Sequence, residues 1–284
     1  MSATRLLGPA DEPALLAFLD AHLESSLFLV GNVLSAGLED RGEALHGVYA
    51  AAFDAGAMTA VAAHYRNGIV LVQGDAGIEQ AASDAVAASG RAVAGLIGPL
   101  HLIVRARRAL GMDGRATRKD DAEILYGLAL DRLRVPALLG SARVACRAPT
   151  PEELGGLLVD WRAAYAIETL GAVRGPALRE EVRGTLASAS PAGWLLLDDS
   201  VPVAYSTFNA QARGVVQVGG VFTPPEHRGL GYARAVVAAS LLEARATGAT
   251  RSVLFTGRTN TAARRAYTAL GYEERGPFGL ALFA

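Results

Sequence analysis

The feature that most constrains the fold is a repeated order of predicted elements. Hydrophobic periodicity and the positions of glycine and proline predict, in the first half, a strand, two helices, three strands, a helix, a strand, a helix and a strand. The same order starts again after the connector "DRLRVPALLGS", with little identity between the halves. We therefore predict a mixed α/β protein with two domains of one architecture, residues 1–140 and 141–284.

Length and composition support two domains and argue against several classes of partner. The 284 residues are 51% hydrophobic and 19% charged, which is enough for two cores. The net charge of −1 gives no basic excess for a nucleic-acid backbone. The N-terminus lacks a signal-peptide core, and the most hydrophobic helical stretch carries Asp20, His22 and Glu24. We expect a cytoplasmic protein that binds neither nucleic acid nor membrane.

The chain has a single cysteine, Cys146, so it has no internal disulfide framework and no thiolate-rich zinc site. We expect no metal. Its apolar surroundings, "ARVACRA", are typical of a strand, and we expect a buried, inert thiol.

The junction "VGGVFTPPEHRGLGYARAVV", Val218 to Val237, predicts an anion site. Main-chain N–H groups in the first turn of a helix lack intrahelical partners and attract negative charge. Gly229 and Gly231 would let a diphosphate lie against the backbone, and Arg228 adds a planar cation. Neither the Rossmann nor the Walker fingerprint is complete here.

The hexapeptide 228–233, Arg-Gly-Leu-Gly-Tyr-Ala, resembles the Arg/Gln-x-x-Gly-x-Gly/Ala signature of the GNAT (GCN5-related) N-acetyltransferases, and its lead-in resembles the FR47-like branch, which includes glycine N-acyltransferase-like proteins. A later segment, "FTGRTNTAARRAYTALGY", resembles the family's Asn-x-x-Ala-x-x-x-Tyr-x-x-x-Gly-Phe segment. The matching residues are Asn260, Ala263, Tyr267, Gly271 and Tyr272. The resemblance implies tandem GNAT-like domains, each a mostly antiparallel central sheet flanked by helices, as in mycothiol synthase-like and glycine acyltransferase-like proteins.

In this family the glycine turn cradles the pyrophosphate of acetyl-CoA, and the preceding strand pairs with the pantetheine arm. The residues implied for acetyl-CoA are Val221, Phe222, Thr223, Arg228, Gly229, Leu230, Gly231, Tyr232, Ala233, Asn260 and Arg264. Asn260 is equally explained as a helix N-cap. Arg264, with Arg258 and Arg265, either meets the 3′-phosphate or adenine side of CoA or lies on a solvated helix face. His227 is expected to be an exposed turn residue.

The resemblance also implies a catalytic residue and an acceptor side. Tyr267 matches the family's tyrosine that protonates the departing thiolate, although its helical spacing also fits a core aromatic. Tyr165 and Glu168 lie where the family's first helices border the acceptor pocket, or on an ordinary helix surface. Tyr205, with Phe208, would set the depth of the pocket.

The reaction expected from the resemblance is direct attack of a primary amine on the thioester, without an acyl-enzyme. A backbone N–H near Phe222 would hold the oxyanion. Many family members carry a Glu on this strand, but "GVVQVGGVF" has Gln217 and no carboxylate. Deprotonating a lysine-like amine at pH 7 costs roughly 4–5 kcal/mol, and an α-amine of pKa near 7.8 only about 1. The acceptor that best fits the missing carboxylate is therefore a small or amino-acid-like amine, with water relaying the proton. Glu168 is the alternative candidate for the general base.

The first half lacks the arginine-glycine signature, since its turn is "VQGDAGIEQAA", with Asp75 near the expected phosphate position. We predict a degenerate, non-catalytic GNAT-like domain that walls the acceptor pocket. Two alternatives stay open for the whole protein: an acyl-CoA sensor without turnover, and a transferase of longer acyl or of aminoacyl groups. A homodimer also stays open.

Overall fold

The computed structural model describes residues 3–188 and 192–284, which form two compact units. The first contains residues 3–125, 255–258 and 275–284 of this set, and the second contains residues 126–188, 192–254 and 259–274. The chain therefore returns to its first unit at the end. The expected boundary near residue 140 stays a prediction about separately folding domains.

The sheet of the first unit is mostly antiparallel. Its strands, in spatial order, are β1 (Ala3–Leu6), β2 (Gly47–Asp54), β3 (Ala57–Tyr65), β4 (Ile69–Gly74), β5 (Gly95–Pro99), β12 (Glu273–Phe283) and residues 117–125 of β6 (Thr117–Ala129). Strands β4 and β5 are parallel, with Ile69 opposite Gly95. The last strand of the chain, β12, pairs antiparallel with β5, from Phe278 opposite Pro99 to Leu282 opposite Gly95. The C-terminal strand thus completes the sheet of the first unit.

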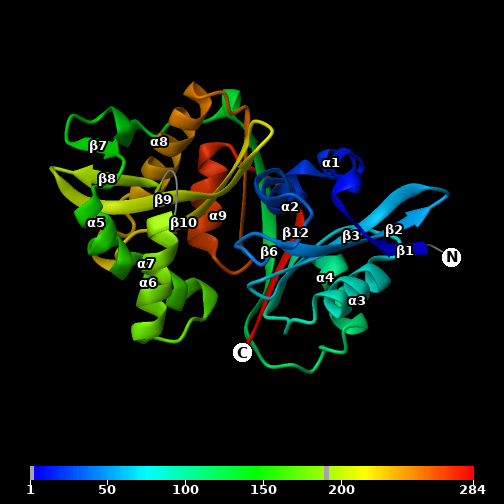
Figure 1. Ribbon diagram of the computed structural model, residues 1–284. Helices are drawn as coiled ribbons and strands as arrows, with labels where there is room; N and C mark the ends of the chain where they lie inside the picture. The colour runs from blue at the N-terminus through cyan, green and yellow to red at the C-terminus, as the bar shows by residue number, and fades with distance from the viewer. Residues whose placement is uncertain (1–2, 189–191) are drawn as a thin grey trace. The chain divides into compact units, whose positions relative to one another are not determined.

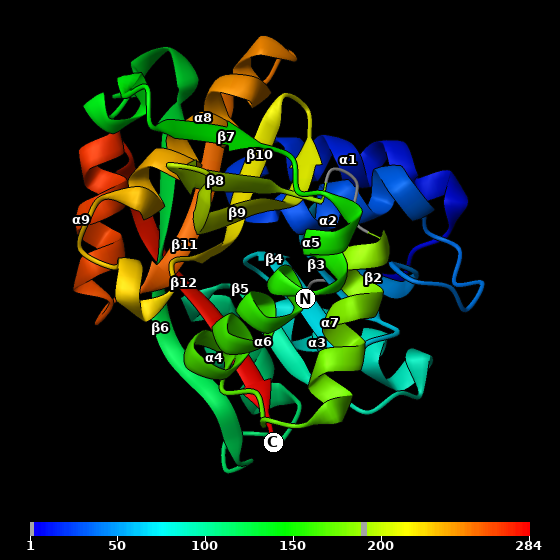
Figure 2. The same cartoon turned by 90° about the vertical axis from the view of Figure 1, so that its left-hand side faces the viewer.

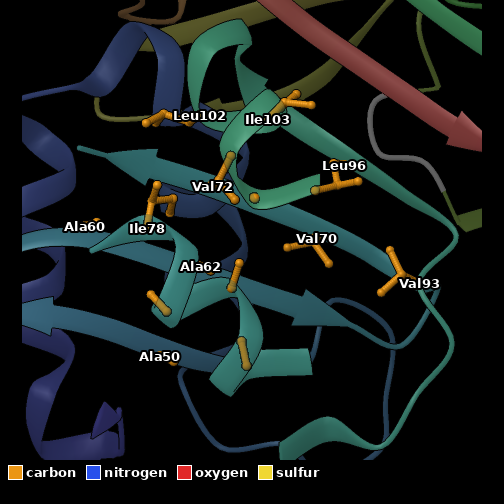
Figure 3. Packing of buried hydrophobic residues seen from close by; sticks show 14 of the residues in the cluster. Ala50, Ala60, Ala62, Val70, Val72, Ile78, Val93, Leu96, Leu102 and Ile103 are labelled. Atoms are coloured by element: carbon orange, nitrogen blue, oxygen red, sulfur yellow. The ribbon is translucent and has the colours of Figure 1, made fainter. Parts of the chain in front are cut away.

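Helices cover both faces of this sheet (Figures 1 and 2). They are α1 (Glu12–Asp20), α2 (Leu23–Ala36), α3 (Ile78–Ser89) and α4 (Leu100–Ala109). Helix α3 packs on β2 and β3, where the inward-facing strand residues are mostly alanine, and small side chains let a helix lie close to a sheet. Figure 3 shows the larger side chains that fill the rest of this core. They include Val70, Val72, Ile78, Leu96, Leu102 and Ile103.

The second unit repeats this arrangement. Its strands, in spatial order, are the end of β6 (Thr117–Ala129), β11 (Arg251–Gly257), β10 (Val215–Phe222), β9 (Val201–Ala212), β8 (Trp194–Asp198) and β7 (Val144–Arg147). Strands β10 and β11 form the parallel pair, and their register ends at Gln217 opposite Val253, although β10 continues to Phe222. The pairing of β10 with β9 is irregular between Gly219 and Phe222, so the end of β10 is bulged.

Five helices of the second unit carry or support the candidate site. They are α5 (Pro151–Gly155), α6 (Leu157–Leu170), α7 (Pro176–Ser188), α8 (Tyr232–Ala246) and α9 (Thr261–Leu270). Helix α8 packs on β8, β9 and β10 and contacts α9, while α6 packs on β10 and against α7. Figures 1 and 2 show α8 on one face of the sheet, with α6 and α7 on the other.

The fold confirms the predicted element order in both halves and a mixed α/β architecture with mostly antiparallel sheets. The expectation for Cys146 needs a correction. The residue lies on the edge strand β7 and is only partly buried, because an edge strand is covered on fewer sides. Burial still raises the pKa of its thiol to about 12, so it is a poor nucleophile at neutral pH.

No group of three or more His, Cys, Asp or Glu side chains among the described residues is placed to hold a metal ion. None of the helices formed by these residues combines the length and apolarity needed to cross a membrane.

Candidate functional site

The site begins at the turn between β10 and α8. A short 3-10 helix, Pro225–His227, leads to Gly229 and Gly231, whose φ angles of 81° and 86° lie in the left-handed region that favours glycine. A Cβ on Gly229 would have no heavy atom within 4 Å, so the backbone there faces open space. The first turn of α8 contains no acidic residue. This combination has the features that favour an anion at a helix start.

The main-chain N–H groups at this turn lack partners among the described residues. Arg228 N–H bonds to the Pro225 carbonyl at 3.2 Å, but no hydrogen bond from the N–H groups of Gly229, Leu230 and Gly231 to a described residue is found. Leu230 is 59% exposed at the mouth of the turn. These N–H groups are therefore available to phosphate oxygens, as the sequence predicts for this segment.

Arg228 is held in place by two acceptors. Its Nε donates to the Thr223 carbonyl at 2.9 Å, and its Nη2 donates to Glu168 Oε2 at 2.8 Å. The guanidinium carbon also lies 5.9 Å from the centre of the Phe222 ring. Arg228 and Glu168 are about half exposed, at 48% and 47%. The structure thus joins the arginine expected on the coenzyme side to the glutamate expected on the acceptor side.

Tyr232 and Ala233 complete the turn. The Tyr232 hydroxyl donates to Asp198 on β8, and this hydrogen bond raises the pKa of the phenol. Asp198 also accepts from Arg143 Nη2 at 3.0 Å. Tyr232 is 8% exposed and anchors the start of α8 to the sheet. Its side chain is structural, so its contribution to an anion site is the backbone N–H.

The end of β10 carries the residues expected along the pantetheine arm. Phe222 pairs with Tyr205 across the bulge, and its ring packs 5.9 Å from that of Trp161 on α6. Val221 is partly exposed. The Thr223 carbonyl is occupied by Arg228, while the Thr223 hydroxyl is buried without a hydrogen-bond partner. An unpartnered buried hydroxyl beside an open turn is compatible with a polar ligand at this point.

Tyr267 lies on α9, partly buried, with its ring 5.9 Å from that of Tyr272. Burial raises the pKa of Tyr267, and the nearby Tyr165 hydroxyl raises it further. The phenol is therefore protonated at neutral pH and can donate a hydrogen bond. The catalytic role of Tyr267 and the acceptor role of Tyr165 stay predictions.

The remaining predicted residues have structural partners. Asn260 is the N-cap of α9, since its Oδ1 accepts from the Ala263 N–H at 3.1 Å. Arg264 donates to Tyr126 at 3.1 Å and to Glu274 at 3.0 Å. Their roles toward CoA stay predictions. The flanking arginines Arg258 and Arg265 are both exposed.

Tyr205 is 1% exposed in the core of the second unit, where it packs with Leu158, Val159 and Leu195. Phe208, which was predicted with Tyr205 to set the depth of the pocket, has its ring centre 4.5 Å from that of Trp194, and the two rings are tilted against each other. A cavity of about 480 Å³ lies between α6 and α7, lined by Ala163, Ile167 and other residues of the α6 face opposite Tyr165. No predicted site residue lines this cavity.

Sequence reasoning missed Arg162, which lies on α6 one turn before Tyr165. Its guanidinium carbon is 5.2 Å from the centre of the Tyr165 ring. Its Nη1 lies directly over Gly220 in the bulge of β10, so closely that a Cβ there would overlap it. The same Nη1 atom is buried and has no hydrogen-bond partner. The signal in the sequence was the Gly219–Gly220 pair, which leaves space beside the strand.

The chain has the fold of the GNAT acetyltransferases: a GCN5-related N-acetyltransferase from Sphaerobacter thermophilus has a TM-score of 0.60 at 17% identity, with 99% of this chain and 94% of that chain covered. A GCN5-related N-acetyltransferase from Kribbella flavida has a TM-score of 0.54 at 21% identity, covering 91% and 93%. A tandem GNAT protein from the clavulanic acid biosynthesis pathway has a TM-score of 0.58 at 14% identity, covering 100% and 98%.

The sequence itself gives a second, shorter match. Residues 158–272 match the model of the acetyltransferase (GNAT) family, and this segment contains α6, the bulged strand β10, the turn and α9. No curated protein matches the sequence significantly. The GNAT resemblance is thus supported for the second unit by sequence and for the whole chain by fold; the FR47-like branch stays a prediction.

Proposed function

We propose that the protein is an acetyl-CoA-dependent N-acetyltransferase whose second unit transfers the acetyl group directly to a small primary amine. The observation that carries this proposal is the start of α8. There, two left-handed glycines and a first turn without acidic residues present N–H groups that have no partner among the described residues, at the end of a bulged strand. The family match over residues 158–272 supports the same activity.

The described residues fit a CoA thioester. The N–H groups of Gly229 to Ala233 would hold the diphosphate, with Arg228 as the adjacent cation. The end of β10 from Val221 to Thr223 would accept the pantetheine arm, and the buried Thr223 hydroxyl would gain a partner. Since Arg228 is bound to Glu168, the diphosphate would compete with this carboxylate for the guanidinium.

In the transfer step the acceptor nitrogen forms a bond to the acyl carbon and the carbon–sulfur bond breaks. The nitrogen loses one proton and the sulfur gains one, so amine and thioester give amide and thiol. A backbone N–H in the bulge near Phe222 would stabilise the charge that develops on the acyl oxygen. Tyr267 would donate a hydrogen bond to the sulfur, because its raised pKa keeps the phenol protonated.

The acceptor must deliver its nitrogen as a free amine. Strand β10 offers no carboxylate, since Gln217 is buried where a base would be expected, and Glu168 is bound to Arg228. A weakly basic amine avoids most of the roughly 4–5 kcal/mol that deprotonating a lysine-like amine costs at pH 7. This supports a small or amino-acid-like acceptor, with water carrying the proton away.

The first unit is proposed to be a second GNAT-like domain that has lost catalysis. Its architecture repeats that of the second unit, and the similarity to a tandem GNAT protein covers the full chain. Its corresponding helix start carries Asp75 and Glu79, whose negative charge opposes a diphosphate.

The test is a pair of measurements on the full chain. Acetyl-CoA is expected to raise the melting temperature of the protein, because a ligand that binds the native state stabilises it. Release of CoA thiol, measured with a panel of small amines and with a lysine-containing peptide, is expected for the small amines. Efficient transfer to the peptide alone would contradict the acceptor class.

One alternative has a specific observation in its favour. The missing base on β10 and the engaged Glu168 would suit a protein that senses acyl-CoA without turnover. Binding of acetyl-CoA without thiol release for any amine, at any pH from 6 to 9, would decide for the sensor. Greater release from longer acyl thioesters than from acetyl-CoA would decide for a transferase of longer acyl groups.

A further inference from the structure

Arg162 is a cation without an anion. Its Nη1 is buried and lacks a hydrogen-bond partner, and no carboxylate in residues 3–188 or 192–284 pairs with its guanidinium. The two acidic residues of α6 are each bound to another arginine, Asp160 to Arg179 and Glu168 to Arg228. An unpartnered buried polar group costs about 1–3 kcal/mol, and more when it is charged. A ligand oxygen that accepted a hydrogen bond from this group would offset that cost.

The surroundings keep the guanidinium in one position. Trp161, the neighbouring residue on α6, packs against Phe222 and fixes the helix on β10. The ring of Tyr165 lies under the guanidinium of Arg162, a cation–π contact that holds the charge without neutralising it. Gly220, with a φ angle of 58°, removes the side chain that would otherwise occupy the same space. The site is therefore built by both helix and strand.

The order of residues along β10 indicates which group would reach Arg162. Under the proposed function, on which this inference rests, the diphosphate lies at 228–233, the pantetheine arm at 221–223 and the thioester near Phe222. Arg162 lies over Gly220, which precedes residues 221–223 along β10, so under this placement it would lie beyond the thioester from the diphosphate. A ligand anion at that point belongs to the acceptor and not to the coenzyme.

We propose that Arg162 binds a carboxylate of the acceptor, so that the acceptors are molecules carrying both a primary amine and a carboxylate. The guanidinium Nη1 donates to a carboxylate oxygen, and a charge-assisted hydrogen bond of this kind is strong in a partly buried site. Pairing with Arg162 also cancels the attraction between the acceptor's carboxylate and its own ammonium. This lowers the pKa of the amine and partly replaces the base that β10 lacks.

The experiment compares each amino acid with its C-terminal amide, which has the same amine but no carboxylate. Across the standard amino acids, thiol release should give a kcat/KM at least about 30-fold higher for the preferred acid than for its amide. In R162Q the value for the acid should fall at least about 30-fold, while the value for the amide stays within threefold. R162K should retain part of the preference, because lysine keeps the charge but not the planar donor group.

Three controls separate this result from loss of fold or of coenzyme binding. The Kd for acetyl-CoA should be unchanged in R162Q and R162K, and neither variant should melt below the wild type, because R162Q removes an unpaired buried charge. R179Q, which removes a paired arginine next to α6, should leave the acid-to-amide ratio unchanged. Equal kcat/KM for acid and amide in the wild type, or equal losses for both in R162Q, would overturn the proposal.

Binding distinguishes the failure of this inference from that of the proposed function. If no amine supports thiol release, titration of amino acids and their amides into the protein with acetyl-CoA present still measures the carboxylate preference. If the protein binds the acid more tightly than the amide and R162Q abolishes this difference, the carboxylate site is supported although the acetyl transfer is not. The absence of that preference would overturn the site.

Discussion

The two units build the same helix start and place opposite charges on it. Helix α3 follows β4 and begins after Gly77, with a φ angle of 88°, and α8 follows β10 and begins after Gly231, with a φ angle of 86°. Both preceding strands are antiparallel to one neighbour and parallel to the other. The backbone at the two turns is therefore nearly the same.

The side chains differ at equivalent positions. The position two residues before the left-handed glycine is Asp75 in the first unit and Gly229 in the second. The second residue of the helix is Glu79 in α3 and Ala233 in α8. Asp75 and Glu79 are both ion-paired with Arg105. In the first unit, Arg105 of α4 thus pairs with the two carboxylates at the start of α3, and the three side chains together carry a net negative charge.

The turns also differ in their main-chain hydrogen bonds. In the first unit the Ile78 N–H donates to the Asp75 carbonyl at 3.3 Å, whereas no such bond between described residues forms at Tyr232 in the second. A helix start alone therefore does not make an anion site. The acidic residues around it, and the partners of its N–H groups, decide whether an anion can bind.

The largest effect on coenzyme binding is expected from Ala233→Glu. This substitution gives the second position of α8 the residue that α3 has there, Glu79. A glutamate in a first turn favours the helix dipole, so the fold should be kept. The added carboxylate repels the diphosphate, and we expect the Kd for acetyl-CoA, measured by isothermal titration, to rise at least about 30-fold, or about 2 kcal/mol.

Ala177→Glu is the matched control. Ala177 is exposed at the second position of α7, so the variant carries the same charge change elsewhere in the second unit. Its Kd should match that of the wild type. Unchanged binding in the Ala233 variant, or equal weakening in both, would contradict an anion site at α8.

Removing the Tyr267 hydroxyl is expected to have the next largest effect. Y267F should lower kcat about 10- to 100-fold without changing the Kd for acetyl-CoA, because the hydroxyl acts on the departing sulfur. The pKa of Tyr267 is raised, so its titration lies above the neutral range and kcat should show no Tyr267-dependent step between pH 6 and 9. In the first unit, Y49F removes a buried hydroxyl bonded to Tyr65 and should leave kcat unchanged. A wild-type kcat in Y267F would contradict the catalytic role of the Tyr267 hydroxyl and leave the residue with a packing role alone.

A smaller effect is expected from the ion pair between Glu168 and Arg228. E168Q frees the guanidinium for the diphosphate, so affinity for acetyl-CoA should rise about two- to fivefold, the range for a half-exposed pair. D160N breaks the other ion pair of α6, with Arg179, and should have no effect on this affinity. Weaker binding in E168Q would mean that Glu168 positions Arg228 for the ligand instead of competing with it.

The smallest effect concerns the start of α3 in the first unit. The hydrogen bond from Arg105 lowers the pKa of Glu79, so its ionised form stabilises the fold. This contribution is present above the unfolded pKa of about 4.3 and is lost as pH falls through the lower folded pKa. E79Q should therefore reduce the free energy of unfolding by about 0.5 kcal/mol at pH 7. In urea titrations the difference should vanish near pH 3; a constant difference at both pH values would exclude a role for the charge.

The sequence was sufficient to predict the elements and the turn. Glycines before α8, the Asn260 cap and the strand patterns are local signals, and each is found where expected. Local signals do not specify partners across the fold. The pattern of β12 predicts a strand, but not that it pairs with β5 of the first unit, because pairing depends on the whole sheet.

The same limit explains what was missed in the site. Glu168 and Arg228 are 60 residues apart, and only the packing of α6 on β10 brings them together. In the sequence, Arg162 is an ordinary charged residue of a helix. Only the folded chain shows that its guanidinium lies over Gly220. Burial without a partner is a property of the folded chain, so no spacing rule could reveal it.

The most direct measurement is the crystal structure of the protein with bound acetyl-CoA. We predict that the diphosphate oxygens accept hydrogen bonds from the main chain between Gly229 and Ala233, with the turn at Asp75 free of coenzyme. A coenzyme bound at the first unit's turn, or bound in the second unit without contacts to those N–H groups, would contradict it.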